Sequence, residues 1–183
     1  MTIAKPKLLV IALGNPGEKY AKTRHNVGWI LFDLLFPEAI WEENSYAHAL
    51  QAEIDGMILV KPLTFMNESG KVIPWFKQKM DIDDEHIVVV HDEVDTALGT
   101  WKFSTMRGNA GHNGIRSIEH HIKPVPRLRI GIGTPGDYNA KPNVLGNFTA
   151  KELEVLETLV LPVKKGLEKI RDLGITKAQS VYK

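Results

Sequence analysis

The chain has 183 residues, a formal net charge of +1 and no cysteine. A chain of this length suits one domain with a sizeable core, and the lack of cysteine excludes disulfides, a thiolate nucleophile and a cysteine metal site. The sequence contains neither a charged-then-apolar leader nor a long uncharged apolar run, so we expect a soluble, cytoplasmic protein that does not enter a membrane.

The charges are distributed unevenly along the chain. Residues 81–95 carry seven acidic side chains and no Lys or Arg, whereas residues 100–131 carry six basic side chains against the single acid Glu119. The six bases are Lys102, Arg107, Arg116, Lys123, Arg127 and Arg129. A local basic surface suits a polyanion, although a solvated charged surface is the commoner explanation.

The first half of the chain alternates strand and helix signals. The apolar run 8–13 predicts a strand covered on both faces, and Asn26 is placed to cap a helix with an apolar side from residue 27 to 35. The Asp55-Gly56 turn predicts a hairpin that joins residues 46–54 to 57–60. A helix over 67–80, kinked or interrupted at Pro74, and a buried strand over 87–90 follow.

The second half adds strands at 101–105 and 127–132, the latter with one basic face and a turn at 133–136, and a short helix within 111–122. The capping box of Thr149 and Glu152 begins a helical segment over 149–177, which Pro162 should bend or split. We therefore predict an α/β fold, one domain over residues 1–183, with a mixed, mostly parallel twisted sheet and helices on both faces.

Polar residues follow the predicted strands, where ligands bind in open α/β sheets. His25 lies just before a helix N-terminus, which disfavours its charged form and suits a general base. Asp92 follows the run 87–90, and its carboxylate can accept the other ring N–H of His25. Asn15, Asn67 and Asn113 offer uncharged donors and acceptors that can hold a water, a peptide or an oxyanion; capping and turn formation are the plainer explanation for each alone.

A metal site is the main alternative at this level. The possible ligands are His25, His91, Asp92, Glu93 and His112, but their spacing matches no common metal-binding pattern, and we expect no metal. The turn at residues 14–17 lacks both the Gly-Lys-Ser/Thr of a phosphate loop and the three-glycine dinucleotide pattern, which argues against a nucleotide cofactor.

Six motifs, in order, resemble those of the bacterial-type peptidyl-tRNA hydrolases and cover the chain from about residue 8 to residue 148. They are Gly14-Asn15-Pro16-Gly17 with Tyr20, Thr23-Arg24-His25-Asn26-Val27-Gly28, Lys61-Pro62-Leu63-Thr64-Phe65-Met66-Asn67 with Ser69-Gly70, His91-Asp92-Glu93-Val94-Asp95, Gly111-His112-Asn113-Gly114, and Arg127-Leu128-Arg129-Ile130-Gly131-Ile132-Gly133. The run at 106–110 departs from the glycines and histidine that the family often has there.

The resemblance implies an enzyme that cleaves the ester between a peptide and the 3′ ribose of tRNA without any cofactor. By this resemblance His25 is the general base and Asp92 orients it, while Asn15, Asn67 and Asn113 position the peptide, the ribose or the water. Tyr20 and Met66 would shape the cleft near the 3′ end.

The six basic residues of 100–131 become candidate contacts to the acceptor stem of tRNA, and a monomer is expected. Two other functions stay open. One is an RNA-binding protein that does not hydrolyse its ligand, and the other is a metal-dependent amidase or peptidase.

Overall fold

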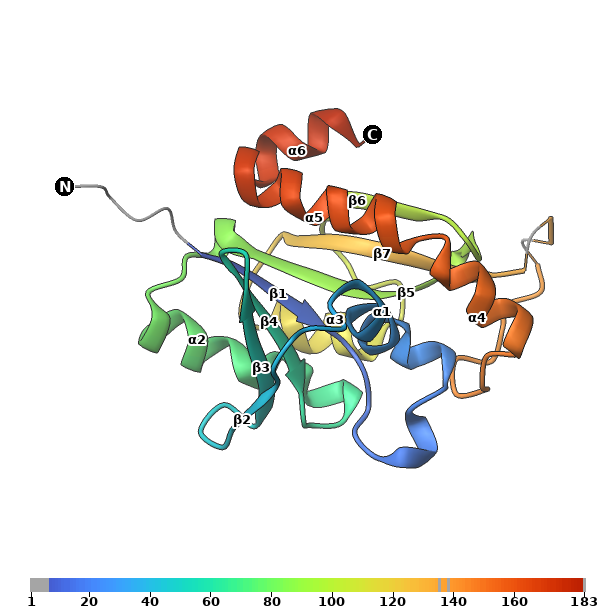
Figure 1. Cartoon of the computed structure of the whole chain (residues 1–183), viewed down its shortest axis with the longest axis horizontal. Helices are drawn as coiled ribbons and strands as arrows, with labels where there is room; N and C mark the ends of the chain where they lie inside the picture. The colour runs from blue at the N-terminus through green and yellow to red at the C-terminus, as the bar shows by residue number, and fades with distance from the viewer. Residues whose placement is uncertain (1–6, 135, 138, 183) are drawn as a thin grey trace.

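The computed structural model describes residues 7–134, 136–137 and 139–182. Its centre is a seven-stranded sheet in the order β2-β3-β4-β1-β5-β7-β6 (Figure 1). The strands are β1 (Leu8–Ala12), β2 (Glu42–Asn44), β3 (Ala49–Ile54), β4 (Met57–Pro62), β5 (Ile87–Ala97), β6 (Trp101–Met106) and β7 (Val125–Gly133). The α-helices are α1 (Val27–Leu35), α2 (Ile73–Met80), α3 (Asn113–Glu119), α4 (Ala150–Glu157), α5 (Val160–Leu173) and α6 (Ile175–Val181).

The sheet is mixed, as predicted, but it is not mostly parallel. Within the described residues, three strand pairs at the centre are parallel and three pairs at the edges are antiparallel. Short connections explain the edges, because a chain needs a dozen or more residues to cross over into a parallel strand. Only residues 98–100 separate β5 from β6, so β6 runs antiparallel to β5 and to its neighbour β7.

The hairpin of β3 and β4 forms as the turn sequence predicts. Asp55 and Gly56 both adopt positive φ, 50° and 75°, and Ile54 pairs with Met57 across the turn. Two consecutive residues with positive φ define the type I′ turn, whose twist matches that of the flanking strands.

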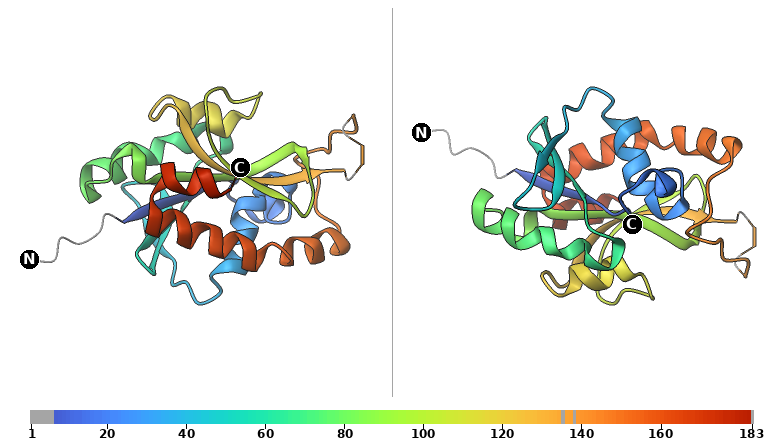
Figure 2. Two further views of the ribbon diagram at one scale, coloured as in Figure 1. Left: turned by 90° about the horizontal axis from the view of Figure 1, so that it is seen from above. Right: turned by 90° about the horizontal axis from the view of Figure 1, so that it is seen from below.

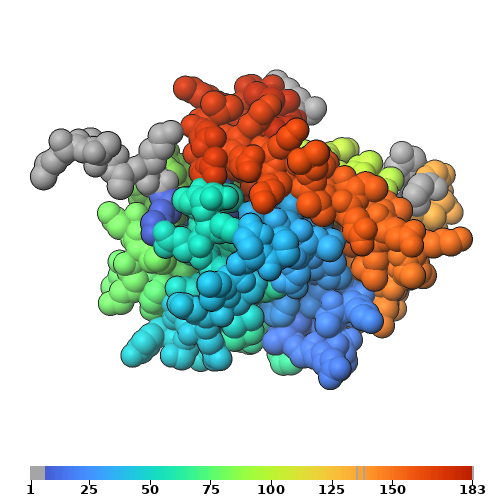
Figure 3. Space-filling view, viewed as in Figure 1, coloured from blue at the N-terminus to red at the C-terminus, as the bar shows by residue number. Residues whose placement is uncertain are grey.

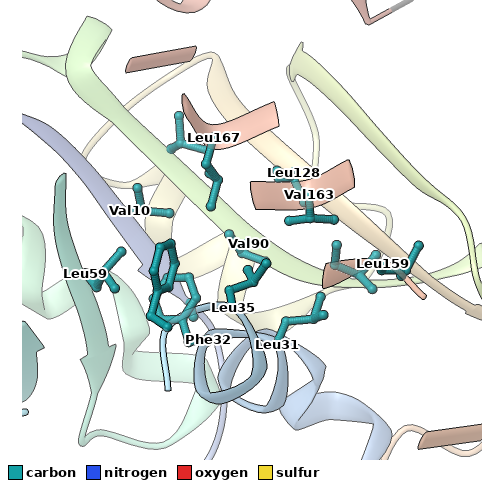
Figure 4. Packing of buried hydrophobic residues seen from close by; sticks show 14 of the residues in the cluster. Val10, Leu31, Phe32, Leu35, Leu59, Val90, Leu128, Leu159, Val163 and Leu167 are labelled. Atoms are coloured by element: carbon teal, nitrogen blue, oxygen red, sulfur yellow. The ribbon is translucent and has the colours of Figure 1, made fainter. Parts of the chain in front are cut away.

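Helices cover both faces of the sheet (Figure 2), and alternate residues of each central strand belong to two different cores. Val10 belongs to a core shared with α1 and α5, where it lies near Phe32 and Leu167 (Figure 4). Its neighbour Ile11 belongs to the second core, with α2 and α3. The continuous apolar run of β1 thus reflects a strand buried on both faces, as predicted.

Two local predictions differ from the structure in detail, and a third includes a residue that the structure does not describe. Residues 66–72 form a 3-10 helix, and Pro74 lies in the first turn of α2, where its missing N–H costs nothing. Strand β5 continues to Ala97 instead of ending near residue 90, because it stays paired with β7. The predicted turn at 133–136 includes residue 135, which lies outside the described residues.

At the C-terminus the helical segment divides into α4, α5 and α6. Thr149 and Glu152 form the predicted capping box at the start of α4. The division between α4 and α5 falls just before Pro162, which occupies the first turn of α5.

A glycine contact joins the 3-10 helix 66–72 to α3, and Gly70→Ala tests it. A methyl group at Gly70 would collide with the carbonyl oxygen of Ser117. We therefore expect the free energy of unfolding, measured by urea titration, to fall by about 2 kcal/mol. The exposed neighbour provides the control, since Lys71→Ala should shift stability by less than about 0.5 kcal/mol. Equal stability of the glycine variant and the wild-type chain would contradict this packing.

Candidate active site

The structure brings His25 and Asp92 into direct contact. Nδ1 of His25 lies 2.8 Å from Oδ1 of Asp92. His25 sits in the short 3-10 helix Arg24–Asn26 before α1, and Asp92 lies inside β5, where its side chain is only 2% exposed. The predicted pair therefore meets, although Asp92 belongs to a paired strand and not to a loop at the strand end.

A second imidazole shares the same carboxylate oxygen. Nε2 of His112 lies 2.9 Å from Oδ1 of Asp92, and Nδ1 of His112 accepts a hydrogen bond from the backbone N–H of Ile115 at the start of α3. Because Nδ1 is an acceptor, Nε2 carries the proton and donates to Asp92. In the sequence His112 is a possible metal ligand and part of the Gly111–Gly114 motif that opens a helix; in the structure it is the N-cap residue of α3.

The electrostatics keep Asp92 ionised. Burial alone would raise the pKa of this carboxyl group, but the electrostatic interaction and hydrogen bond with His112, followed by those with His25, hold the pKa well below its ordinary value. An ionised Asp92 accepts the Nδ1–H of His25, which leaves Nε2 of His25 as a hydrogen-bond acceptor. That tautomer is the one a general base requires.

His91 precedes Asp92 and is buried beside the same cluster. Its Nδ1 lies 2.7 Å from the carbonyl oxygen of Asp92, and its ring meets that of His112 edge to face. Burial, followed by the electrostatic interaction with the nearby His112, lowers the pKa of His91 well below its usual range. His91 is therefore a neutral imidazole at physiological pH, with Nε2 unpartnered among the described residues.

Asparagines connect the turn after β1 to the rest of the site. Asn26 does not cap α1 as predicted; its side chain bonds both the N–H and the C=O of Asn15, each at 2.9 Å. Asn15 in turn accepts the backbone N–H of Met66 through Oδ1 at 2.8 Å. Asn26 thus fixes the turn that carries Asn15, a role that no local sequence pattern reveals.

A cavity of about 440 Å³ opens beside the two histidines, and Asn113 forms part of its wall. Oδ1 of Asn113 accepts a hydrogen bond from Arg116 at 2.8 Å. Met66 is buried against Gly114 at the start of α3, and the adjacent Asn67 is exposed. Tyr20 lies outside the cavity lining, and its ring meets Phe65 edge to face at 6.3 Å.

The segment after β7 holds the backbone of the His25 helix in place. The N–H of Arg24 donates to Gly146, and the N–H of His25 donates to Val144. A bidentate ion pair joins Arg24 to Glu152 of α4, at 2.9 and 3.0 Å. In Figure 3 the orange region around α4 accordingly lies against the blue segment that follows β1.

The predicted RNA-contacting bases do not share one environment. Four of them are exposed, namely Lys102, Arg107, Arg116 and Lys123. Arg129 is half-buried, with Nη1 3.6 Å from Glu93. Arg127 is only 3% exposed; it borders the cavity, and its Nη2 donates to the carbonyl groups of Met106 and Gly108 inside the protein.

One cluster has the composition of a metal site. The ligand atoms of His25, Asp92 and His112 all lie within 4.8 Å of one another. In the arrangement described above, however, both imidazoles direct N–H groups at the same carboxylate oxygen. A cation would have to displace both protons, so the residues fit a carboxylate with two donors better than a resident metal ion.

Comparison with known proteins supports the resemblance found in the motifs. The family model for peptidyl-tRNA hydrolase matches residues 9–183. This chain belongs to the peptidyl-tRNA hydrolase family. A peptidyl-tRNA hydrolase of Fervidobacterium nodosum is 38% identical over 179 residues, which cover 96% of this chain and 95% of that protein. One of Sulfurovum sp. is 38% identical over 184 residues, covering 95% and 94%.

A solved structure of the same family has the same fold. The crystal structure of peptidyl-tRNA hydrolase from Acinetobacter baumannii gives a TM-score of 0.82 at 31% identity, covering 100% of this chain and 99% of that chain. Over its described residues, this family member contains no helix that combines the length and apolar character needed to cross a membrane.

The neutral state of His91 predicts how stability depends on pH. A histidine in the unfolded chain binds a proton near pH 6.5, whereas buried His91 does not, so the unfolded state gains protons first as the pH falls. Below pH 6.5 the free energy of unfolding should therefore fall by about 1.4 kcal/mol per pH unit from this residue alone.

Urea titrations between pH 7.5 and 5.5 check this, with His91→Asn keeping the donor to the backbone but removing the titrating ring. We expect the free energy of unfolding of His91→Asn to depend on pH less steeply than that of the wild-type chain, by the equivalent of about one bound proton. The exposed His48→Asn serves as the matched control and should behave like the wild-type chain. Parallel slopes for wild type and His91→Asn would show that His91 titrates normally in the folded state.

Proposed function

We propose that this chain hydrolyses the ester that joins the C-terminal carbonyl of a peptide to the 3′ ribose of tRNA, as a monomeric, single-domain enzyme of the cytoplasm. The observation that carries the proposal is the contact between His25 and a buried, ionised Asp92 at a cavity, in a member of the peptidyl-tRNA hydrolase family. Hydrolysis then requires water, one base and donors for the developing charge.

In the proposed first step, Nε2 of His25 removes a proton from water while the water oxygen attacks the ester carbonyl. The resulting imidazolium is stabilised by the Asp92 carboxylate at Nδ1. When the tetrahedral intermediate collapses, the bond to the ribose O3′ breaks, and the imidazolium returns its proton to that oxygen. Free peptide acid and free tRNA leave, with no covalent enzyme intermediate.

The asparagines are proposed to supply donors. Oδ1 of Asn15 is already used by the N–H of Met66, and Oδ1 of Asn113 is used by Arg116. In both side chains the oxygen is occupied from within the protein, which leaves the NH₂ group to meet a ligand. Two such donors suit a carbonyl oxygen or a developing oxyanion better than they suit a cation.

The remaining assignments concern the tRNA. Asn67 is exposed next to Met66 and is proposed to hold the terminal ribose, while Tyr20 and Met66 shape the path of the 3′ end. The exposed bases of β6, α3 and their loops, Lys102, Arg107, Arg116 and Lys123, are proposed to hold phosphates of the acceptor stem, together with Arg129.

Substitution of the base tests the reaction directly. We expect the wild-type chain to hydrolyse N-acetyl-aminoacyl-tRNA in the presence of EDTA and to spare aminoacyl-tRNA with a free amino group. His25→Ala should lower the rate by about 100-fold or more, because it removes general-base catalysis. The matched control is His48→Asn, an exposed histidine that lies outside the six motifs and outside the cavity lining.

Each of the other functions has its own signature in this assay. Binding of tRNA without cleavage by the wild-type chain would support an RNA-binding protein. Activity that EDTA abolishes would support a metal-dependent enzyme. Near-normal turnover by His25→Ala would remove His25 from its proposed role.

Asp92→Asn separates chemistry from binding. A carboxamide carries no charge and cannot stabilise the imidazolium that forms on His25, so we expect kcat to fall by about 100-fold or more. Affinity for tRNA, measured by filter binding, should change less than about threefold because Asp92 is buried and is not one of the proposed phosphate contacts. Equal losses in kcat and affinity would contradict this division.

A further inference from the structure

Arg127 is a buried cation that the proposed reaction does not use. It lies on β7 with a side chain only 4% exposed, and Nη2 donates to the carbonyl oxygens of Met106, at 3.3 Å, and Gly108. Burying a guanidinium is costly unless its hydrogen bonds are made. Met106 is the last residue of β6, and Gly108 belongs to the loop that connects β6 to α3.

Glu119, at the end of α3, completes the same cluster. Its Oε1 lies 3.8 Å from Nη2 of Arg127, and its Oε2 accepts a hydrogen bond from Nδ2 of Asn109 at 3.0 Å. Burial would raise the pKa of Glu119, but the hydrogen bonds of Asn109 and the Gly108 N–H, with the nearby cations, lower it. The buried ion pair therefore holds the loop through two hydrogen bonds, from Arg127 to Gly108 and from Asn109 to Glu119.

These contacts stabilise a loop whose backbone is strained at Ala110. Gly108, Ala110 and Gly111 all have positive φ, at 83°, 47° and 84°, and an alanine adopts that conformation at a cost. Within the loop, Oδ1 of Asn109 accepts the N–H of Gly111 at 3.0 Å, and the carbonyl of Asn109 accepts the N–H of His112 at 2.8 Å. These hydrogen bonds connect the loop to the backbone N–H of His112, whose imidazole donates to Asp92.

We propose that Arg127 and Glu119 are positioning residues, which hold loop 106–111 so that His112 donates to Asp92 and keeps that carboxylate aligned with His25. The proposal rests on the proposed function, because it concerns the geometry of the same catalytic pair. It assigns Arg127 an internal role in place of the phosphate contact that its sequence position suggested.

Two variants test the proposal at different points of the same connection. Arg127→Gln removes the guanidinium, and Asn109→Ala removes the hydrogen bonds of the Asn109 side chain to Glu119 and to the N–H of Gly111 without touching the buried ion pair. The substrate is N-acetyl-aminoacyl-tRNA, and the readouts are kcat and KM per folded enzyme, the pH profile of kcat/KM, and the salt dependence of tRNA binding. Lys102→Gln, an exposed base on the neighbouring strand β6, is the comparison variant.

We expect both variants to lower kcat about tenfold, to change KM less than twofold, and to shift the acidic limb of the pH profile. The slope of log affinity against log salt should stay at the wild-type value in both, whereas Lys102→Gln should reduce it by about 0.7 to 0.9 if its charge meets a phosphate. Because Arg127→Gln is a substitution in the interior, thermal melting accompanies it. If that variant does not fold, Asn109→Ala carries the test alone.

Two results would overturn the proposal. A reduced salt slope with unchanged kcat for Arg127→Gln would make Arg127 a phosphate contact. If Asn109→Ala has an unchanged kcat and pH profile per folded molecule, the cluster of Arg127, Glu119 and Asn109 stabilises the fold only and does not position His112. An inactive wild-type chain would instead contradict the proposed function, so the two failures are distinguishable.

Discussion

A carboxylate inside a buried strand has to be paired, and Asp92 is paired with two imidazoles at one oxygen. This constraint links three separate parts of the chain: the helix that carries His25, the central strand β5 and the start of α3, where His112 lies. It also sets the protonation of the site, since an ionised Asp92 demands an N–H from each ring. Because Nδ1 of His25 carries the proton that Asp92 accepts, Nε2 of His25 is left unprotonated.

Local patterns predict the parts of this fold whose causes are local. The apolar run of β1, the Asp55-Gly56 turn and the Thr149 capping box each contain their own physical reason, and each forms as expected. The contact of His25 with Asp92 was also predictable, because side chains near the carboxyl ends of neighbouring parallel strands lie close together.

The features that escaped prediction depend on partners far away in the sequence. Asn26 stands where a helix cap belongs, yet it bonds Asn15 instead, and only the folded turn supplies that partner. The alternation of β7 places Arg127 on a basic strand face, but it does not reveal that a loop and Glu119 cover that residue. The prediction of a mostly parallel sheet was wrong for a different reason, because short connections near both edges reverse the chain.

The backbone of His25 is held by residues 144–148, and Arg24 beside it is held by Glu152. During synthesis the ribosome therefore completes His25, Asp92 and all three asparagines before it makes the segment that secures the base. A growing chain carries every group of the candidate site long before those groups can be aligned. Assembly of the site is thus a late event in translation, and it waits for α4 to emerge.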